Sequence, residues 1–339
     1  MVNPKVVLDV SVRGQKGLGR YLDMISDGLR ISSYDVIEFG KMRNPFSIMS
    51  FFRIPPFKRH CVYIYPHVNV PIVMLFSKSK IILCIHDVIP FYRSHIKTLI
   101  WKQFIHLLTS KNNVAIVCPS YYSLQKSREF FGFVSNKGTV IHNRYTTPIA
   151  HKRDMTISIS QHLSCIYIGN NLPHKNVQVL IDAINLIYSD KSNDKLVTLK
   201  LFLGSEVKQK VALNIPKSVL RYITIYPQIS DSELAAYMHQ SHVLVQPSLH
   251  EGFGIPILEA LGSGLKCIAS DIPVFRELFE DCVLYFNPND PSQLAKMLLN
   301  INSISNPNTN KIELLLERYS FANTSLKFAS LIQGNDTTT

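Results

Sequence analysis

The sequence lacks the features that mark several classes of protein. Its six cysteines form no Cys-x-x-Cys pair, so neither a disulfide framework nor a zinc site is expected. No window approaches the roughly 18 apolar residues of a membrane span, and no secretion signal opens the chain. There is also no Asp-x-Asp pair to hold a divalent cation. These absences predict a cytoplasmic, reduced protein without a metal cofactor.

Acidic residues are scarce in one half of the chain only. Residues 1–150 hold 20 Lys and Arg against 7 Asp and Glu, whereas residues 151–339 hold 16 against 17. A nucleic-acid-binding protein is not expected to separate its charge so sharply. The first half is therefore predicted to face an anionic surface, and nucleic acid is not an expected partner.

Apolar residues are plentiful, at 46% of 339 positions, which excludes a disordered chain and predicts about two domains. Short runs rich in Val, Ile, Leu and Cys alternate with longer amphipathic segments, as in parallel strands covered by helices on both faces. The expected strands are 6–10, 61–65, 81–85, 114–118, 140–141, 165–168, 199–203, 223–226, 243–245, 267–269 and 283–285.

This rhythm predicts an α/β fold with two doubly wound, Rossmann-like domains and a ligand cleft between them. The first domain is expected at residues 1–150 and the second at 151–332, followed by a frayed tail at 333–339. Hydrophobic periodicity lapses at about 143–161, which marks the linker, and residues 311–332 read as a terminal helix.

The most informative segment is residues 247–264, directly after an expected strand. Gly252 and Gly254 let main-chain amides approach an anion, and a helix begins beside Pro256. This order of strand, glycine loop and helix N-terminus suits a phosphate. Glu251 and Glu259 flank the loop and could face one bound nucleotide sugar from opposite ends. Alternatively, the first is a solvated loop carboxylate and the second complements the helix dipole.

Two segments of the first half also follow expected strands. Gly17 and Gly19 are either a tight turn or part of a binding loop. Arg20, just past them, either pairs with a phosphate or caps the packing against the sheet. His86 stands at the carboxyl end of a strand, where open α/β sheets bind their ligands, so we expect a ligand contact rather than a core histidine. Its neighbour Asp87 either joins that site or caps a turn.

Lys175 follows the first expected strand of the second half. It is predicted near the start of a helix at residues 176–188, where a cation opposes the helix dipole. Such a placement is unfavourable unless an anion is bound nearby. The sequence therefore predicts an anion site at Lys175.

Taken together, these segments resemble glycosyltransferase family 4, whose members are retaining enzymes of the GT-B fold. Residues 247–270 are similar to the family signature, and three shorter segments match in order over most of the chain. These are Gly14 to Tyr21 (GQKGLGRY), His86 to Pro90 (HDVIP) and Gly169 to Asn176 (GNNLPHKN). The chain departs from the family at Asn170 and Asn171, where many members carry an arginine; His174 or an arginine of the first domain is left as a substitute.

The resemblance implies transfer of a hexose from a nucleoside diphosphate sugar to a hydroxyl, with the anomeric configuration retained and no metal. It implies catalytic roles for Glu251, His86 and Lys175, with His86 beside the transferred sugar and Lys175 at the leaving diphosphate. The donor-binding residues implied are Gly17, Gly19, Arg20, Asn170, Gly252, Phe253, Gly254, Ile255 and Glu259.

The acceptor side is inferred from the basic half. Residues 41–60 mix cations with aromatics, and residues 93–111 place Ile96, Leu99, Ile100, Phe104, Leu107 and Leu108 on one helical face. The helix either faces the core or attaches to anionic lipid, and the charge favours attachment at the inner face of the plasma membrane. With the resemblance, this implies a lipid-linked saccharide acceptor, GDP-mannose as the first donor, and O-antigen or capsule assembly.

Two other functions stay open. A sugar-nucleotide epimerase on the same architecture would need further acidic residues in the cleft. A non-catalytic, basic membrane-binding protein would give Glu251, Glu259 and Lys175 no role. The oligomeric state is not readable from the sequence.

Overall fold

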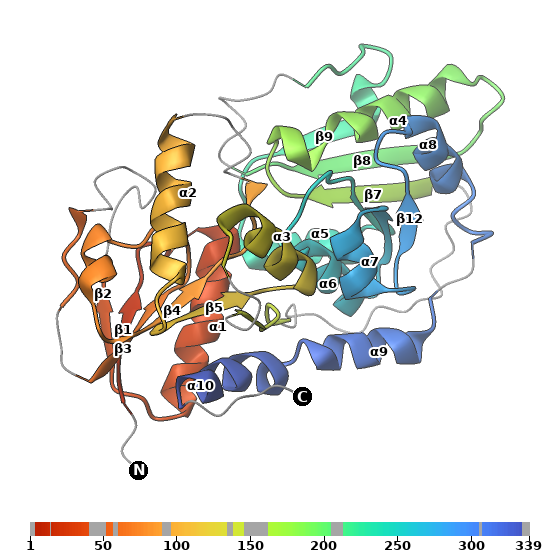
Figure 1. Ribbon diagram of the computed structural model, residues 1–339. Coiled ribbons are helices and arrows are strands. Elements are labelled where there is room, and N and C mark those ends of the chain that lie inside the picture. Colours follow the sequence, from red (N-terminus) through yellow and green to blue (C-terminus); the bar gives the residue numbers. More distant parts are fainter. Residues whose placement is uncertain are drawn as a thin grey trace. The chain divides into compact units, whose positions relative to one another are not determined.

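The structure is a computed structural model that describes residues 4–13, 15–40, 52–56, 60–89, 96–133, 138–145, 162–204, 213–304 and 307–333 (Figure 1). The chain divides into two compact units. Residues 1–144 and 318–339 form the first, and residues 145–317 form the second. Most of the expected linker and the tail beyond residue 333 lie outside the described residues. The expected cleft between the units stays a prediction.

In its described residues, the first unit contains a six-stranded parallel sheet with the order β2-β1-β3-β4-β5-β6. The chain starts at β1, adds β2 on one side and then β3 on the other. The order therefore reverses between β1 and β3, which opens a crevice at the carboxyl ends of these two strands. The strands are β1 Lys5–Asp9, β2 Val36–Phe39, β3 Cys61–Tyr65, β4 Lys80–Cys84, β5 Val114–Cys118 and β6 Gly138–Val140.

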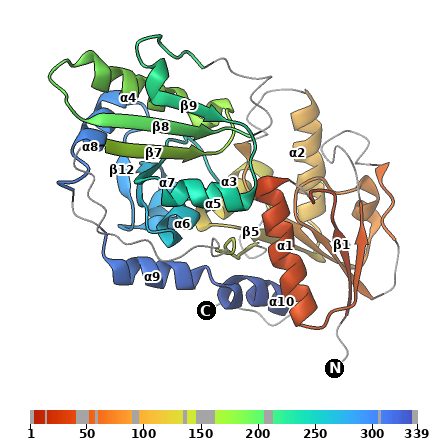
Figure 2. The ribbon, with the colours of Figure 1, turned by 180° about the vertical axis from the view of Figure 1, so that it is seen from behind.

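Helices cover both faces of this sheet, because alternate strand residues point to opposite sides. Val6 and Leu8 pack with α1 and α10, which lie side by side in both views, whereas Val7 packs with α2 and α3 (Figures 1 and 2). The helical elements are α1 Lys16–Ile31, the 3₁₀ helix η2 Ile72–Phe76, α2 Ile96–Thr109, α3 Tyr121–Phe131, the π-helical turn η8 Ala322–Leu326 and α10 Lys327–Ile332.

The apolar face expected on the helix at 93–111 is split. Phe104 and Leu108, with Ile105 between them, are buried against the sheet, but Leu99, Ile100 and Leu107 are exposed. The side chain of Ile96 and residues 93–95 lie outside the described set. The apolar stripe of α2 is therefore wider than the side that the core covers.

The end of the chain returns to the first unit, which corrects two expectations. Residues 318–332 were predicted in the second domain, yet the Tyr34 hydroxyl donates to the Ala329 carbonyl at 3.0 Å and Lys80 Nζ donates to the Leu331 carbonyl at 2.9 Å. The single helix predicted at 311–332 is instead α9 Thr309–Arg318, then η8 and α10. Apolar periodicity shows that a helix is buried but not which sheet it covers.

Residues 318–332 can pack on the first unit because the main chain of Ser325 lies close to Gly28 of α1. This contact gives a prediction about stability. A Cβ at Gly28 would overlap the main-chain carbonyl of Ser325, which cannot rotate away. Gly28→Ala should therefore destabilise the protein by about 1–3 kcal/mol, despite the roughly 1 kcal/mol by which alanine favours a helix. The measurement is urea or thermal unfolding.

Gly17→Ala in the same helix is the matched control, because a Cβ there meets no atom within 4 Å. Equal unfolding midpoints for the two variants would show that the contact at Ser325 adapts without cost.

The second unit contains, in its described residues, a second six-stranded parallel sheet with the order β12-β11-β10-β7-β8-β9. The chain runs outward from β7 to β9 and returns to add β10 on the other side of β7. This sheet therefore reverses between β7 and β10. Its strands are β7 His162–Ile168, β8 Leu196–Phe202, β9 Ile223–Tyr226, β10 Val243–Gln246, β11 Lys266–Ser270 and β12 Leu284–Phe286.

Helices of the second unit pack on its sheet in the same manner. On one side α4 and α8 lie together against an aliphatic core, while α6 contacts β10 and β11 (Figure 2). The remaining elements are the 3₁₀ turns η5 Pro173–Lys175 and η7 Leu220–Tyr222 and the helices α4 Gln178–Ser189, α5 Asp231–His239, α6 Ile255–Gly262, α7 Pro273–Phe279, α8 Pro291–Leu299 and α9.

All six cysteines are free and buried. Within the described residues, each helix is too short or too polar to cross a lipid bilayer.

Candidate active site

Lys175 and Glu251 meet at the switch point of the second sheet. Lys175 ends η5 after β7, Glu251 follows β10, and these strands pair directly, so their carboxyl ends share an edge. Lys175 Nζ donates to Glu251 Oε1 at 2.6 Å, and both side chains are largely buried. The fold thus joins two residues that the sequence proposed separately.

The start of the helix after Lys175 differs from the prediction. It was expected at residues 176–188, but α4 is Gln178–Ser189 and Lys175 lies in a separate 3₁₀ turn. Asn176 interrupts the two with a left-handed backbone, φ 53°, and its side-chain amide donates to the Pro288 carbonyl at 2.8 Å. The lysine is consequently placed by this turn, not by the first turn of α4.

Polar groups converge on one oxygen of Glu251. Ser248 Oγ donates to Oε1 at 2.8 Å and Gln246 Nε2 donates to it at 3.3 Å, alongside Lys175. Burial alone would raise the pKa of Glu251, but the charge and hydrogen bond of Lys175, with Ser248 and the charge of His174, lower it overall. Glu251 is therefore ionised at neutral pH and cannot donate a proton, although it can accept hydrogen bonds.

The glycine loop has the geometry of an anion site. Gly254 adopts φ 118° as the N-cap of α6, and a Cβ there would lie 2.9 Å from the Phe275 ring, so only glycine fits. Among the described residues, the amides of Gly254 and Ile255 have no hydrogen-bond acceptor. The Phe253 ring is buried in the core, which leaves only its main chain to face a ligand.

Glu259 is buried one turn into α6, and its donor-binding role stays a prediction. Burial is the main cause that raises the pKa of Tyr145, and the charge of Glu259 is the second cause. The Tyr145 hydroxyl rests on Gly262, where a Cβ would overlap it. Tyr145 is a neighbour of the site that sequence reasoning missed.

Asn170 is held within its own turn. Its carbonyl accepts from the Tyr167 hydroxyl at 2.8 Å, and its side-chain oxygen accepts weakly from the Leu172 amide at 3.4 Å. The carbonyl of His174 accepts from the Leu249 amide at 2.8 Å, which ties the lysine turn to the glutamate loop. The donor-binding role of Asn170 stays a prediction.

In the first unit, Gly17, Gly19 and Arg20 lie inside α1, so the tight-turn interpretation was wrong. The Gly19 amide donates to the Gln15 carbonyl at 2.7 Å, and a side chain at Gly17 would enter open space. Arg20 is half-buried and has interactions with its surroundings. The glycines therefore form the first turn of α1 at the switch point between β1 and β3.

His86 follows β4 and is held by main chain. Its Nε2 lies 2.9 Å from the Pro66 carbonyl, so this nitrogen carries the proton, and the Tyr21 ring packs edge-on at 4.4 Å. Burial is the main cause that lowers its pKa to about 4. His86 is thus a neutral ring whose Nδ1 accepts hydrogen bonds and has no partner among the described residues. Asp87 Oδ1 accepts from the Ile89 amide at 2.9 Å and caps that turn.

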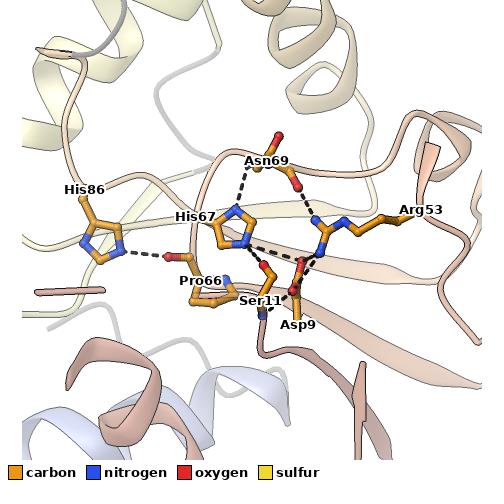
Figure 3. Close-up of polar contacts among 7 residues, drawn as sticks. All are labelled: Asp9, Ser11, Arg53, Pro66, His67, Asn69 and His86. Carbon is orange, nitrogen blue, oxygen red and sulfur yellow. Dashed lines mark hydrogen bonds and ion pairs between the residues drawn. The ribbon is translucent and has the colours of Figure 1, made fainter. Parts of the chain in front are cut away.

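Sequence reasoning missed the residues that support the site. Ser248 and Gln246 hold Glu251, and a buried cluster around Asp9 lies beside His86 (Figure 3). A polar residue at the carboxyl end of an apolar strand was the available signal for Gln246 and Asp9. No group of three or more His, Cys, Asp or Glu residues within the described residues is arranged to hold a metal ion.

Two doubly wound sheets, with a cation, a carboxylate and a glycine-capped helix at one switch point, define the class of protein. The chain has the GT-B fold, as the solved structures below show, and its sequence resembles glycosyltransferase family 4. Residues 159–312 match the model of the family described as glycosyl transferases group 1, which covers most of the second unit.

Curated relatives agree with this class. The chain is 28% identical over 251 residues to the O-antigen chain mannosyltransferase RfbU of Salmonella typhimurium, a match that covers 71% of this chain and 66% of that protein. It is 29% identical over 137 residues to the O-antigen chain mannosyltransferase B of Escherichia coli, covering 40% of this chain and 35% of that protein. The chain therefore spans less than two thirds of the length of these relatives.

Solved structures share the fold. HepE of Anabaena in complex with UDP-glucose superposes with a TM-score of 0.73 at 14% identity, covering 98% of this chain and all of that chain. WaaG, a glycosyltransferase involved in lipopolysaccharide biosynthesis, superposes with a TM-score of 0.63 at 14% identity, covering 97% of this chain and 100% of that one. At these identities the likeness shows the fold alone.

The Lys175–Glu251 pair gives a stability prediction. In the wild type, the lowered pKa of Glu251 stabilises the native state above its ordinary value of 4.5, and this contribution is lost as the pH falls through the lowered value. Lys175→Met leaves the carboxylate buried without its cation, so the variant should lose about 3 kcal/mol at pH 7. Its stability should rise, not fall, as the pH drops toward 5, as measured by urea unfolding.

The double variant Lys175→Met, Glu251→Gln is the control, because it removes the stranded charge. It should recover most of the lost stability. If the two substitutions are simply additive, the pair does not interact in the folded protein.

Proposed function

We propose that the protein transfers a hexose, with mannose as the first candidate, from a nucleoside diphosphate sugar to a lipid-linked saccharide, retaining the anomeric configuration, in O-antigen assembly. The relatives named O-antigen chain mannosyltransferases support the sugar and the pathway. Over 68 residues, which are 20% of this chain and 8% of that protein, the chain is 43% identical to the serotype-specific mannosyltransferase WbdA of Escherichia coli. The structure of HepE with UDP-glucose supports a nucleotide sugar as donor.

The observation that carries the proposal is the contact between Lys175 and Glu251, because Glu251 begins the glycine loop that leads into α6. When the bond between the anomeric carbon and the leaving phosphate oxygen breaks, the electron pair goes to the diphosphate. Lys175 and the amides of Gly254 and Ile255 would stabilise that charge. Because the two amides are held in place by the start of α6, they need no rearrangement during the reaction.

Glu251 and His86 have different parts in this mechanism. Glu251 is ionised and paired, so it serves as an acceptor for sugar hydroxyls and holds Lys175, and it is not the acid that protonates the leaving group. His86 is neutral and offers Nδ1 to a hydroxyl of the transferred sugar. The acceptor oxygen bonds to the anomeric carbon, and its proton passes to the leaving phosphate oxygen, so no protein nucleophile is required.

The test is transfer and hydrolysis with GDP-mannose, UDP-glucose, UDP-galactose and UDP-N-acetylglucosamine, each with and without EDTA. We expect activity with GDP-mannose that EDTA does not abolish. Lys175→Ala should lower kcat by roughly 100-fold, because one preorganised donor to the leaving group is worth about 3 kcal/mol. If no nucleotide sugar binds, the proposal fails; if the donor sugar is epimerised without an acceptor, the epimerase alternative replaces it.

We propose further that the first unit attaches to anionic lipid. Three neighbouring apolar side chains of α2, Leu99, Ile100 and Leu107, are exposed, as is Phe76 of η2, which α2 contacts. The excess of cations in residues 1–150 favours an anionic surface over a neutral one.

The segment around Arg53 also supports lipid attachment, because its charged side chain is buried while its apolar neighbours are exposed. Phe52 and Ile54 are 67% and 78% exposed, whereas the Arg53 side chain between them is only 9% exposed and pairs with Asp9. Burying an arginine while exposing its two apolar neighbours costs stability in water. The cost is offset if Phe52 and Ile54 insert into lipid.

Co-sedimentation with liposomes tests this attachment. The double variant Leu99→Ser, Ile100→Ser should bind vesicles containing anionic lipid at least tenfold more weakly, since each buried aliphatic side chain contributes about 1.5–3 kcal/mol. Leu314→Ser is the control, because Leu314 is even more exposed, 71% against 58% for Leu99 and 60% for Ile100, but belongs to the second unit. The proposal would be contradicted if vesicle binding were unchanged both by the double substitution and by the content of anionic lipid.

A further inference from the structure

Four consecutive residues after β3 connect three other parts of the first unit (Figure 3). The Pro66 carbonyl holds His86, the His67 ring contacts the end of β1, and the Asn69 carbonyl accepts from Arg53 Nη2 at 2.7 Å. The segment from Pro66 to Asn69 lies at the switch point between β1 and β3. Any movement of this segment would therefore move the group that holds His86.

The His67 ring is fixed in one protonation state by its partners. The Asn69 amide donates to His67 Nδ1 at 2.9 Å, so this nitrogen carries no proton. The other nitrogen, Nε2, then bears the hydrogen, and it lies 2.8 Å from Ser11 Oγ and 3.5 Å from Asp9 Oδ2. The neutral His67 ring thus connects Asp9 with Asn69. Both His67 and Ser11 are buried.

Asp9 is the centre of the cluster. Its carboxylate faces Arg53 Nη1, with distances of 3.0 Å to Oδ1 and 2.8 Å to Oδ2, and it accepts from the Ser11 amide at 2.9 Å. Burial alone would raise the pKa of Asp9, but His67, the Arg53 guanidinium and the Ser11 amide lower it overall. Asp9 is therefore charged at neutral pH although it is fully buried.

The main chain at Gly40 packs closely against this cluster. A Cβ at Gly40 would lie 2.6 Å from Asp9 Oδ1 and 2.7 Å from Arg53 Nη1, and Gly40 has φ 87°. A buried ion pair is commonly no more stable than a well-packed apolar pair of the same volume. Stability alone therefore does not account for two charges here, whereas fixed hydrogen-bond geometry does.

We propose that Asp9 is a positioning residue for His86: through His67 and Arg53 it clamps the segment from Pro66 to Asn69, and the Pro66 carbonyl then holds His86 as the Nε2-protonated ring. This rests on the proposed function, in which Nδ1 of His86 receives a hydroxyl of the transferred sugar. Without the clamp, the ring could rotate or protonate, and Nδ1 would no longer be an acceptor at the required position.

The experiment compares wild type with Asp9→Asn, by heteronuclear NMR of the histidine rings and by kinetics with the active donor. The His86 signal is assigned by its loss in His86→Gln. In the wild type we expect the Nε2-protonated tautomer, neutral until the pH falls to about 4. The ring is faced by Tyr21 from α1 and His67 from the β3 loop, which are unchanged in the variant.

In Asp9→Asn, His86 should titrate closer to the ordinary value of 6.5 and show mixed tautomers. We expect kcat to fall roughly 10- to 100-fold, as for a misplacement of about 1 Å, while the donor KM changes less than twofold. Ser11→Ala, which removes one partner of His67 and leaves the ion pair intact, should shift both readouts in the same direction by a smaller amount. If Asp9→Asn fails to fold, the Ser11→Ala variant tests the proposal in its place.

Glu38→Gln is the matched control, because it removes an acidic partner from the exposed Arg13–Glu38 pair of the same unit. It should leave the His86 signal and kcat unchanged. A folded Asp9→Asn or Ser11→Ala with the wild-type tautomer and kcat overturns the inference. If instead His86→Gln transfers sugar at the wild-type rate, the proposed sugar contact fails, while coupling of Asp9 to the His86 signal remains measurable on its own.

Discussion

In each sheet the strand order reverses once, and a cluster of charged and polar side chains lies at that reversal. A parallel strand buried on both faces has no room for charge along its length, so charged and polar side chains are placed where the strand ends. At a reversal, two adjacent strands send their following loops in opposite directions, which leaves their carboxyl ends uncovered. Lys175 with Glu251, and Asp9 with His67, occupy these two positions.

The two clusters each pair a buried carboxylate with a cation, but the cation differs. Glu251 is stabilised by a lysine, and its oxygen Oε1 also accepts from Ser248. Asp9 is stabilised by an arginine whose second nitrogen bonds a carbonyl, which fixes the pair in one geometry. Lysine is a mobile point charge and arginine a planar fork. The choice of cation fits the ligand site proposed for the second unit and the positioning role proposed for Asp9 in the first.

Much of the fold and part of the candidate site could be predicted from the sequence. Apolar runs identified the strands of both sheets except β2, Val36–Phe39, whose residues are mostly half-buried and include Glu38. The lysine loop, His86 and the glycine loop were all found because each follows an apolar strand. Their partners were not found: Ser248 is an ordinary loop serine, and Arg53 lies in a stretch that reads as basic surface. Contacts across long sequence separations leave no local pattern.

The return of residues 318–332 to the first unit affects how the protein folds during its synthesis. Phe328, Ala329 and Ile332 fill the core between α1 and the first sheet, but they leave the ribosome only after the whole second unit. The second unit is contiguous and can fold as soon as it emerges. The first unit must wait with an open apolar face, so this half of a nascent chain is the one that chaperones would have to protect.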